Sequence, residues 1–186
     1  MDCQSNSVMK IPFYVFFFVS TLTFSQGKYL TKTGELRFEA SVPSFEEVAA
    51  KNNAVTAIMN TENGEIAALA LINGFRFKNA LMEEHFNENY AESNKYPKAI
   101  FQGKVENFSM ENATGNFKIT GKLTFHGVTK TIEDIPVSVK KNGDKITIIG
   151  SFKVLAPDFN IEIPKIVRNK IAEDVQVSFS FELLKK

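Results

Sequence analysis

Three observations predict a mainly β, antiparallel fold for this sequence. Beyond residue 26, apolar residues recur at every second position, which is the periodicity of strands that bury one face. Short turns rich in Gly, Asn and Asp separate these stretches and favour hairpin connections. Too few helical stretches intervene for a parallel α/β sheet. We expect about eight strands, and an even number favours a closed barrel or a sandwich because closure removes exposed edges.

The first 25 residues have the pattern of a secretory signal peptide. A short positive region ends at Lys10, an uncharged apolar region covers residues 11–24 (IPFYVFFFVSTLTF), and Ser25 is a small residue at the expected cleavage point. The apolar region is too short for a comfortable membrane helix, which needs about 20 residues, so we expect no stable span after cleavage. An uncleaved anchor is the alternative. The predicted organisation is a signal peptide at 1–25 and a single β-barrel domain at 26–186, in a periplasmic or secreted protein.

The overall charge gives no support for nucleic acid or anionic lipid as a partner of the whole chain, and the cysteine content argues against disulfides and thiolate metal sites. The net charge is +1 with both signs interspersed, so there is no basic stripe along the chain to favour nucleic acid or anionic lipid. The single cysteine, Cys3, precedes the apolar region, so the mature chain is expected to have no disulfide and no thiolate metal ligand. The domain must depend on core packing alone.

The first half of the domain is predicted to contain three strands and a short helix. Residues 34–42 (GELRFEASV) alternate, and residues 44–51 begin with a capping-box pattern (SFEE) typical of a helix start. Residues 54–59 and 66–72 flank the turn TENGE and predict a hairpin. The second of these strands is apolar at nearly every position, so we expect it to be covered on both faces.

Residues 79–94 are the one clear helical stretch in the middle of the chain. Met82, Phe86 and Tyr90 recur every four residues, and Asn79 can cap the helix start. This stripe predicts either a helix packed on the sheet or a lid over a cavity.

From Ala99 onward the chain is predicted to be nearly all strand. Asn142-Gly143 is the strongest hairpin signal, because a tight twisted turn requires positive φ. A long connection, with room for a helical turn or two in residues 164–172, precedes the last strand. The predicted strands are 99–108, 115–125, 131–140, 145–154 and 175–184.

The predicted strands share one apolar, aromatic face, and the opposite face is polar. Gly103, Gly121 and Gly150 fall on the apolar parity, where they leave space inside or mark bulges. An eight-stranded barrel is either just filled by side chains or holds one small ligand. A filled interior would indicate a structural or adhesive β-domain without ligand. For the hollow alternative, the candidate ligand-binding residues are Met82, Phe86, Phe101, Val105, Phe117, Ile119, Leu123, Phe125, Ile146, Ile148, Phe152, Val154, Phe179 and Phe181.

Three motifs resemble the YceI-like family. Residues 83–101 (EEHFNENYAESNKYPKAIF) are similar to its helix, Tyr-Pro pair and Phe-led strand. Residues 121–137 (GKLTFHGVTKTIEDIPV) resemble its hairpin signature, with Gly-Val-Thr-Lys at 127–130 matching residue by residue. Residues 152–164 (FKVLAPDFNIEIP) resemble its Asp-Phe/Tyr-Gly turn, with Asn160 where Gly is usual.

The resemblance implies a lipocalin-like antiparallel barrel around a long apolar cavity. It also implies an apolar small-molecule lipid as partner, such as an isoprenoid lipid or a prenyl quinone, and no other cofactor. The helix departs from the family's Arg-Asp-x-His-Leu pattern because it keeps Glu84 and His85 but has no Arg, so the length of the ligand does not follow from the resemblance. An oligomer is left open.

Signals for catalysis or metal binding are weak. The only histidines are His85 and His126, whereas a zinc site needs three or four ligands. The chain has no G-x-S-x-G elbow and no phosphate-binding loop. An enzyme acting on lipid ranks last, since the inward rows contain no polar group. A small basic cluster at Lys165, Arg168 and Lys170 either meets an anionic headgroup at the barrel rim or is an exposed loop.

Overall fold

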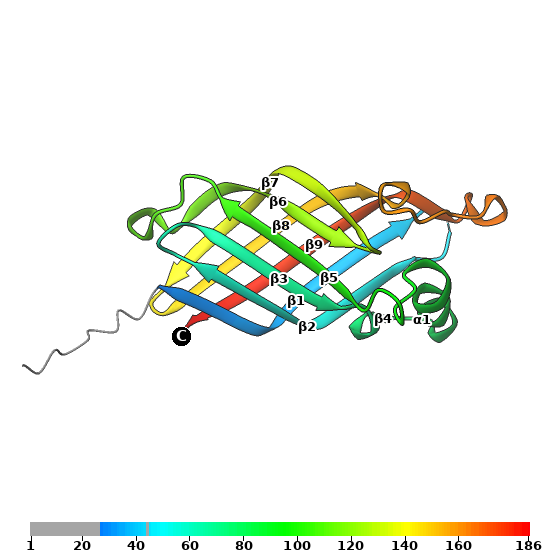
Figure 1. Cartoon of the computed structure of the whole chain (residues 1–186), viewed down its shortest axis with the longest axis horizontal. Helices are drawn as coiled ribbons and strands as arrows, with labels where there is room; N and C mark the ends of the chain where they lie inside the picture. Colours follow the sequence, from blue (N-terminus) through cyan, green and yellow to red (C-terminus); the bar gives the residue numbers. More distant parts are fainter. Residues whose placement is uncertain (1–26, 44) are drawn as a thin grey trace, which may run out of the picture.

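The computed structural model describes residues 27–43 and 45–186 (Figure 1). The predicted signal peptide at 1–25 lies outside the described residues. In chain order, the strands are β1 (Lys28–Ser41), β2 (Ala49–Asn60), β3 (Glu65–Leu71), β4 (Arg76–Phe77), β5 (Lys98–Val105), β6 (Gly115–Phe125), β7 (Val128–Asn142), β8 (Lys145–Leu155) and β9 (Ile171–Lys185).

Helical structure is short and lies mostly between strands. The helix α1 (Ala80–His85) continues into one π-helical segment, η2 (Phe86–Tyr90). The predicted turn in 164–172 is a single 3₁₀ segment, because β9 already begins at Ile171. The four 3₁₀ segments of the described chain are η1 (Ile72–Gly74), η3 (Met110–Asn112), η4 (Ala156–Phe159) and η5 (Lys165–Val167).

Eight of the strands form a closed antiparallel barrel, which confirms the predicted fold class. Their order is β1-β9-β8-β7-β6-β5-β3-β2, and pairing between β1 and β2 closes the ring (Figure 1). The two-residue β4 is an addition that pairs only with the start of β2. Closure leaves none of the eight long strands with an unpaired edge along its whole length.

The hairpin signature at residues 121–137 forms a hairpin that turns at His126-Gly127. Both residues have positive φ, 48° and 75°, as a tight two-residue turn requires. The charged pair Glu133-Asp134 lies inside β7 at a shift in the pairing register. Asp134 has φ 55° and forms an ion pair with Lys118 at 2.8 Å. This bulge restores Ile135 to the inward face, where it is 2% exposed.

Three expectations for the first half are wrong. No helix occurs in the described part of 44–51, because Ala49 to Lys51 pair with β1 and extend β2. The first strand begins at Lys28, where Tyr29 is already buried at 3% exposure. The outer face of β3 is not covered, since Leu71 is 47% exposed.

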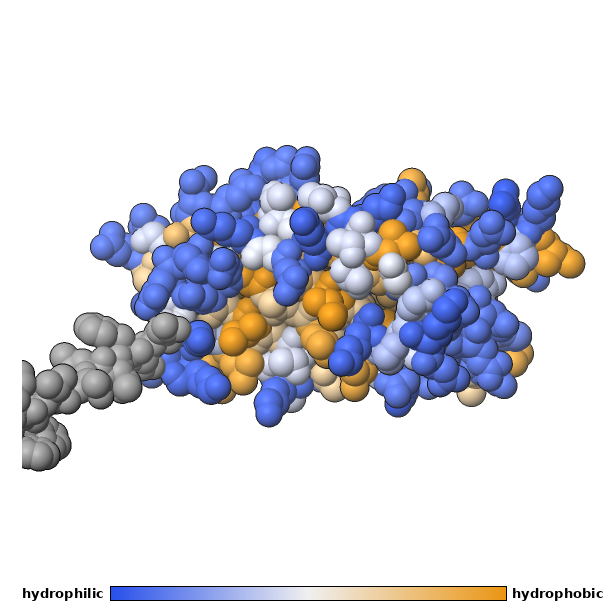
Figure 2. All heavy atoms as spheres, viewed as in Figure 1, coloured by the Kyte–Doolittle hydropathy of each residue, from blue (hydrophilic) through white to orange (hydrophobic). Residues whose placement is uncertain are grey.

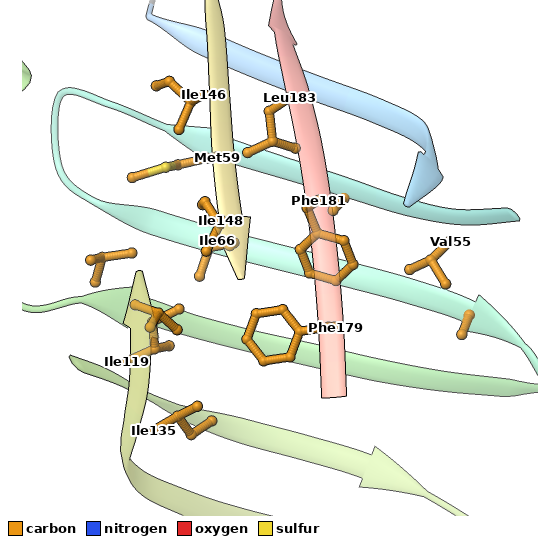
Figure 3. Close-up of a cluster of buried hydrophobic side chains, with 14 of the residues drawn as sticks. Val55, Met59, Ile66, Ile119, Ile135, Ile146, Ile148, Phe179, Phe181 and Leu183 are labelled. Atoms are coloured by element: carbon orange, nitrogen blue, oxygen red, sulfur yellow. The ribbon is translucent and has the colours of Figure 1, made fainter. Parts of the chain in front are cut away.

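The barrel interior has two different halves. Toward the end that holds the C-terminus (Figure 1), buried apolar side chains from several strands meet in the interior (Figure 3). Met59, Ile146, Ile148 and Leu183 meet there, each with zero relative exposure. This packed half supplies the hydrophobic core on which the fold depends. The other end carries α1, η2 and the connection between β8 and β9 (Figure 1).

Candidate ligand-binding cavity

The second half of the barrel encloses a cavity of about 590 Å³. This volume lies within the roughly 300–1,000 Å³ of typical small-molecule sites. Most of the lining is aliphatic and aromatic, from the inward faces of the strands, from α1 and η2, and from the connections at this end. Nine of the predicted ligand-binding residues line it: Met82, Phe86, Phe101, Leu123, Phe125, Phe152, Val154, Phe179 and Phe181.

In β8 and β6 the inward residues change from buried to partly exposed along the strand, which agrees with the position of the cavity. In β8, Ile146 and Ile148 have zero exposure, whereas Phe152 and Val154 on the same face are partly exposed. In β6, Ile119 is 1% exposed, whereas Leu123 and Phe125 on the same face are partly exposed. The exposed parts of these inward side chains face the cavity that they line.

Phenyl rings form the floor between the hollow and the packed half. Phe179 and Phe181 stack with ring centroids 5.1 Å apart (Figure 3). The Phe179 ring covers Gly150, where an added Cβ would lie 2.6 Å from it. The ring of Phe101 covers Gly121 in the same way, at 2.5 Å. Of the two alternatives for the inward glycines, empty space does not hold at Gly121 and Gly150, because aromatic rings approach the backbone closely there.

Five predicted ligand-binding residues lie outside this cavity. Four are almost fully buried in the packed half, where neighbouring side chains occupy the interior. The fifth, Phe117, packs against Phe108 with centroids 5.9 Å apart. All five have inward parity but lie outside the lining of the cavity: Val105, Phe117, Ile119, Ile146 and Ile148.

The predicted stripe on the helix faces the cavity. Asn79 caps α1 as expected, because its Oδ1 accepts a hydrogen bond from the Leu81 amide at 2.9 Å. Met82, Phe86 and Tyr90 all line the cavity. The Phe86 ring is the centre of an aromatic cluster, with centroid distances of 5.1 Å to Phe38, 5.3 Å to Phe77 and 6.0 Å to Phe75.

Several residues that line the cavity were not among the ligand-binding residues predicted from the sequence. Leu36, Phe38 and Ala40 of β1 line the cavity, and the alternation of residues 34–42 was the signal that could have identified them. Among the described lining residues, four have polar side chains: Glu46, His85, Tyr90 and Lys170. Glu46, His85 and Lys170 are exposed, which places charged and polar groups at the mouth and leaves the interior apolar.

Ion pairs join the connection before β2 to its neighbours. The Glu47 carboxylate accepts hydrogen bonds from the ammonium of Lys78 and, at 2.8 Å, from the Arg37 guanidinium. The two cations, Lys78 first, hold the pKa of Glu47 below its ordinary value. The pKa of Arg37 is raised, mainly by its hydrogen bond to Glu39. This network links β1, the residues before β2 and the residue before the helix cap.

The three motifs that resemble the YceI-like family meet at one side of the cavity end of the barrel. His126, at the hairpin tip, has a side chain only 9% exposed. One ring nitrogen lies 2.8 Å from the Phe159 carbonyl, and the other lies 2.7 Å from the Glu92 carboxylate. The Tyr96 ring packs edge-on at 4.6 Å and covers Gly127, where an added Cβ would lie 2.7 Å from that ring. We call His126, Glu92, Tyr96 and Phe159 the hairpin latch.

The hairpin latch explains why these residue types occur together. It joins the β6–β7 turn, the segment after η2 and the end of η4, and Phe159 also lines the cavity. Asn160 has φ 57° and ψ 32°, which is the left-handed conformation that favours Gly or Asn. The motifs therefore hold Phe159, one residue of the cavity wall, in place, whereas the sequence alone indicated His126 only as a weak candidate for a metal ligand.

The described residues offer little for catalysis. Among them, no group of three or more His, Cys, Asp or Glu side chains is placed to hold a metal ion. The buried polar Asn52 is structural: its amide donates to the Leu71 carbonyl at 2.9 Å, and its oxygen accepts from the Ala54 amide. Within residues 27–43 and 45–186, no helix has the length and apolarity to cross a bilayer.

The fold and the cavity together define a lipocalin-like barrel with the architecture of a small-molecule binding protein. The chain belongs to the YceI-like family, since the model of the YceI-like domain matches residues 19–183. Among curated proteins, no significant match was found.

Solved structures share this fold at low sequence identity. A polyisoprenoid binding domain from Saccharophagus degradans, implicated in plant cell wall breakdown, has a TM-score of 0.72 at 17% identity, covering 87% of this chain and 99% of that one. BcnA from Burkholderia cenocepacia has a TM-score of 0.68 at 18% identity, covering 82% of this chain and 96% of that one. The YceI protein of Campylobacter jejuni has a TM-score of 0.62 at 20% identity, covering 78% and 89%.

Proposed function

We propose that this protein binds a single amphiphilic lipid with a long apolar tail, of the isoprenoid or prenyl quinone type. The observation that carries the proposal is the 590 Å³ apolar cavity in a barrel whose other half is packed. Transfer of each methylene from water into such a space contributes about 0.8 kcal/mol. A five-carbon isoprene unit would thus contribute on the order of 4 kcal/mol.

The distribution of polar groups supports an amphiphile rather than a plain hydrocarbon. The tail would contact phenylalanines of the wall, such as Phe125 and Phe152, and would end at the floor. The headgroup would remain at the mouth, where Glu46, His85 and Lys170 lie. A polyisoprenoid binding domain among the solved structures with this fold fits the proposed class of ligand.

The proposal also concerns where the protein is located and whether it acts by binding or by catalysis. We expect export to the periplasm or secretion, because residues 1–25 have the pattern of a signal peptide. We expect binding without catalysis, since the polar lining residues lie at the mouth and not around a buried point of reaction.

Lipid extraction and mass spectrometry of protein purified from its native host test the proposal. We expect an apolar lipid in the wild-type protein and none in Phe125→Asp, which places a charge in the cavity wall. Lys122→Asp on the outer face of the same strand is the matched control and should retain the lipid. A wild-type protein that carries no apolar molecule, and binds no added farnesol, contradicts the proposal.

The alternative of a structural or adhesive domain depends on the outer surface. An apolar group lies on the outer face of the barrel over β2 and β3 (Figure 2), and Leu71 there is 47% exposed. Such a surface is compatible with an oligomer. It does not explain the cavity, which a purely structural domain would fill.

A further inference from the structure

The connection between β8 and β9 carries an exposed apolar residue among cations, at the cavity end of the barrel. Ile166, in η5, is 85% exposed, the highest among the large apolar side chains reported as exposed in the described chain. Its neighbours Val167 and Lys170 line the cavity. In Figure 2, a hydrophobic group lies at the right-hand tip of the molecule, where Figure 1 places this connection.

The charges around Ile166 are predominantly positive. Lys165, Arg168 and Lys170 lie within six residues of one another, with no acidic residue between them. Arg168 donates to the Ile163 carbonyl at 3.1 Å and lies 3.7 Å from Glu173. Within the described chain, the ammonium groups of Lys165 and Lys170 have no carboxylate partner. Two cations beside the apolar tip are therefore available to an external anion.

Other exposed apolar side chains lie on the neighbouring segments at this end. Phe45 is 47% exposed and lines the cavity, and Leu81, in the first turn of α1, is 58% exposed. Exposed apolar side chains and unpaired lysines at one end of a protein are the combination that interfacial membrane binding requires, because the apolar groups enter the acyl boundary while the cations attract anionic headgroups.

We infer that this end of the barrel, led by Ile166 and Lys165, docks on an anionic lipid bilayer. The inference rests on the proposed function, because a tail that resides in a bilayer avoids contact with water if the mouth opens directly onto the membrane. A docked mouth lets the tail slide between two apolar media. The docking residues Ile166 and Lys165 do not line the cavity, so docking and ligand affinity can be measured separately.

Vesicle flotation of the purified protein tests the docking surface. We expect wild-type protein to float with phosphatidylcholine vesicles that contain phosphatidylglycerol, to float less as salt is added, and to bind weakly to phosphatidylcholine alone. Ile166→Ser should reduce binding about tenfold, and Lys165→Glu should reduce binding and its dependence on salt. Leu184→Ser is the matched control: Leu184 is 56% exposed near the C-terminus, at the opposite end, and the substitution should leave flotation unchanged.

Binding of farnesol without vesicles, and the thermal midpoint, are measured on the same variants. Unchanged farnesol affinity and midpoint with reduced flotation support the docking surface. The docking surface is overturned if Ile166→Ser floats as well as the wild type, or if Leu184→Ser loses as much flotation as Ile166→Ser. The docking surface is also overturned if the wild type does not bind vesicles but forms a dimer that Ile166→Ser disrupts. In that case Ile166 contacts a second copy of the chain. If the wild type floats but binds no farnesol, the proposed function fails and the docking surface stands.

Discussion

Filling the cavity from within is the sharpest test of the hollow half of the barrel. Ala68, in β3, lines the cavity and is partly exposed to it, next to Phe101 in the pairing with β5. Ala68→Leu adds about three methylene equivalents to this space. If each displaces one methylene of the ligand tail, the variant loses about 2.4 kcal/mol of binding, or roughly 50-fold in affinity.

The stability of the same variant distinguishes a hollow interior from a solid one. In a hollow interior the new side chain enters empty space, so the free energy of unfolding without ligand should stay constant or rise. In a filled interior, overpacking would cost about 1–3 kcal/mol.

The assay combines urea unfolding with displacement of the dye N-phenylnaphthylamine by farnesol. Ala67→Leu, on the outer face of the same strand, is the control and should change neither quantity. A loss of stability in Ala68→Leu without loss of farnesol affinity would refute the reasoning.

Three further predictions concern the segments that hold the mouth. His126→Gln should lower the free energy of unfolding by about 1–3 kcal/mol, since the two ring nitrogens of His126 lie within hydrogen-bond distance of the Phe159 carbonyl and the Glu92 carboxylate in the hairpin latch; urea midpoints equal to wild type would contradict this. Lys78 and Arg37 lower the pKa of Glu47 in the folded protein. The ionised Glu47 therefore stabilises the fold fully above the ordinary carboxyl pKa, and this stabilisation is lost as the pH falls through the lowered pKa of the folded state. Urea midpoints from about pH 6 to 3 should therefore fall more steeply for wild type than for Glu47→Gln. Asn160→Val should cost about 1–3 kcal/mol because of its left-handed backbone, whereas Asn160→Gly should cost less than 1 kcal/mol; equal thermal midpoints for the two variants would exclude backbone strain.

Local patterns were sufficient for most strands and for the helix start. The alternation in residues 115–125 corresponds to β6 to the residue, because a barrel strand has one wet and one buried face and its side chains repeat with period two. Asn79 was identifiable because a cap acts within a few residues. The helix expected at 44–51 failed for the opposite reason: a capping pattern is local, and pairing of Ala50 with β1 prevailed over it.

The boundary between the packed and the hollow half could not be read from the sequence. Ile148 and Val154 share one strand and one parity, yet the first is fully buried and the second lines the cavity. The difference depends on what lies across the barrel, and those contacts are distant in sequence. The same holds for His126, whose partners lie 33 and 34 residues away.

The aromatic floor makes the barrel blind-ended. A ligand can enter and leave only at the mouth, so it enters with its tail first and leaves with its headgroup first. The depth of the cavity from mouth to floor then selects the length of the tail. A tail that just reaches Phe101 and Phe179 binds with the highest affinity, and a longer tail leaves carbon atoms exposed to water. Relatives with smaller residues at those two positions would have a deeper cavity in the same barrel and would bind a longer tail.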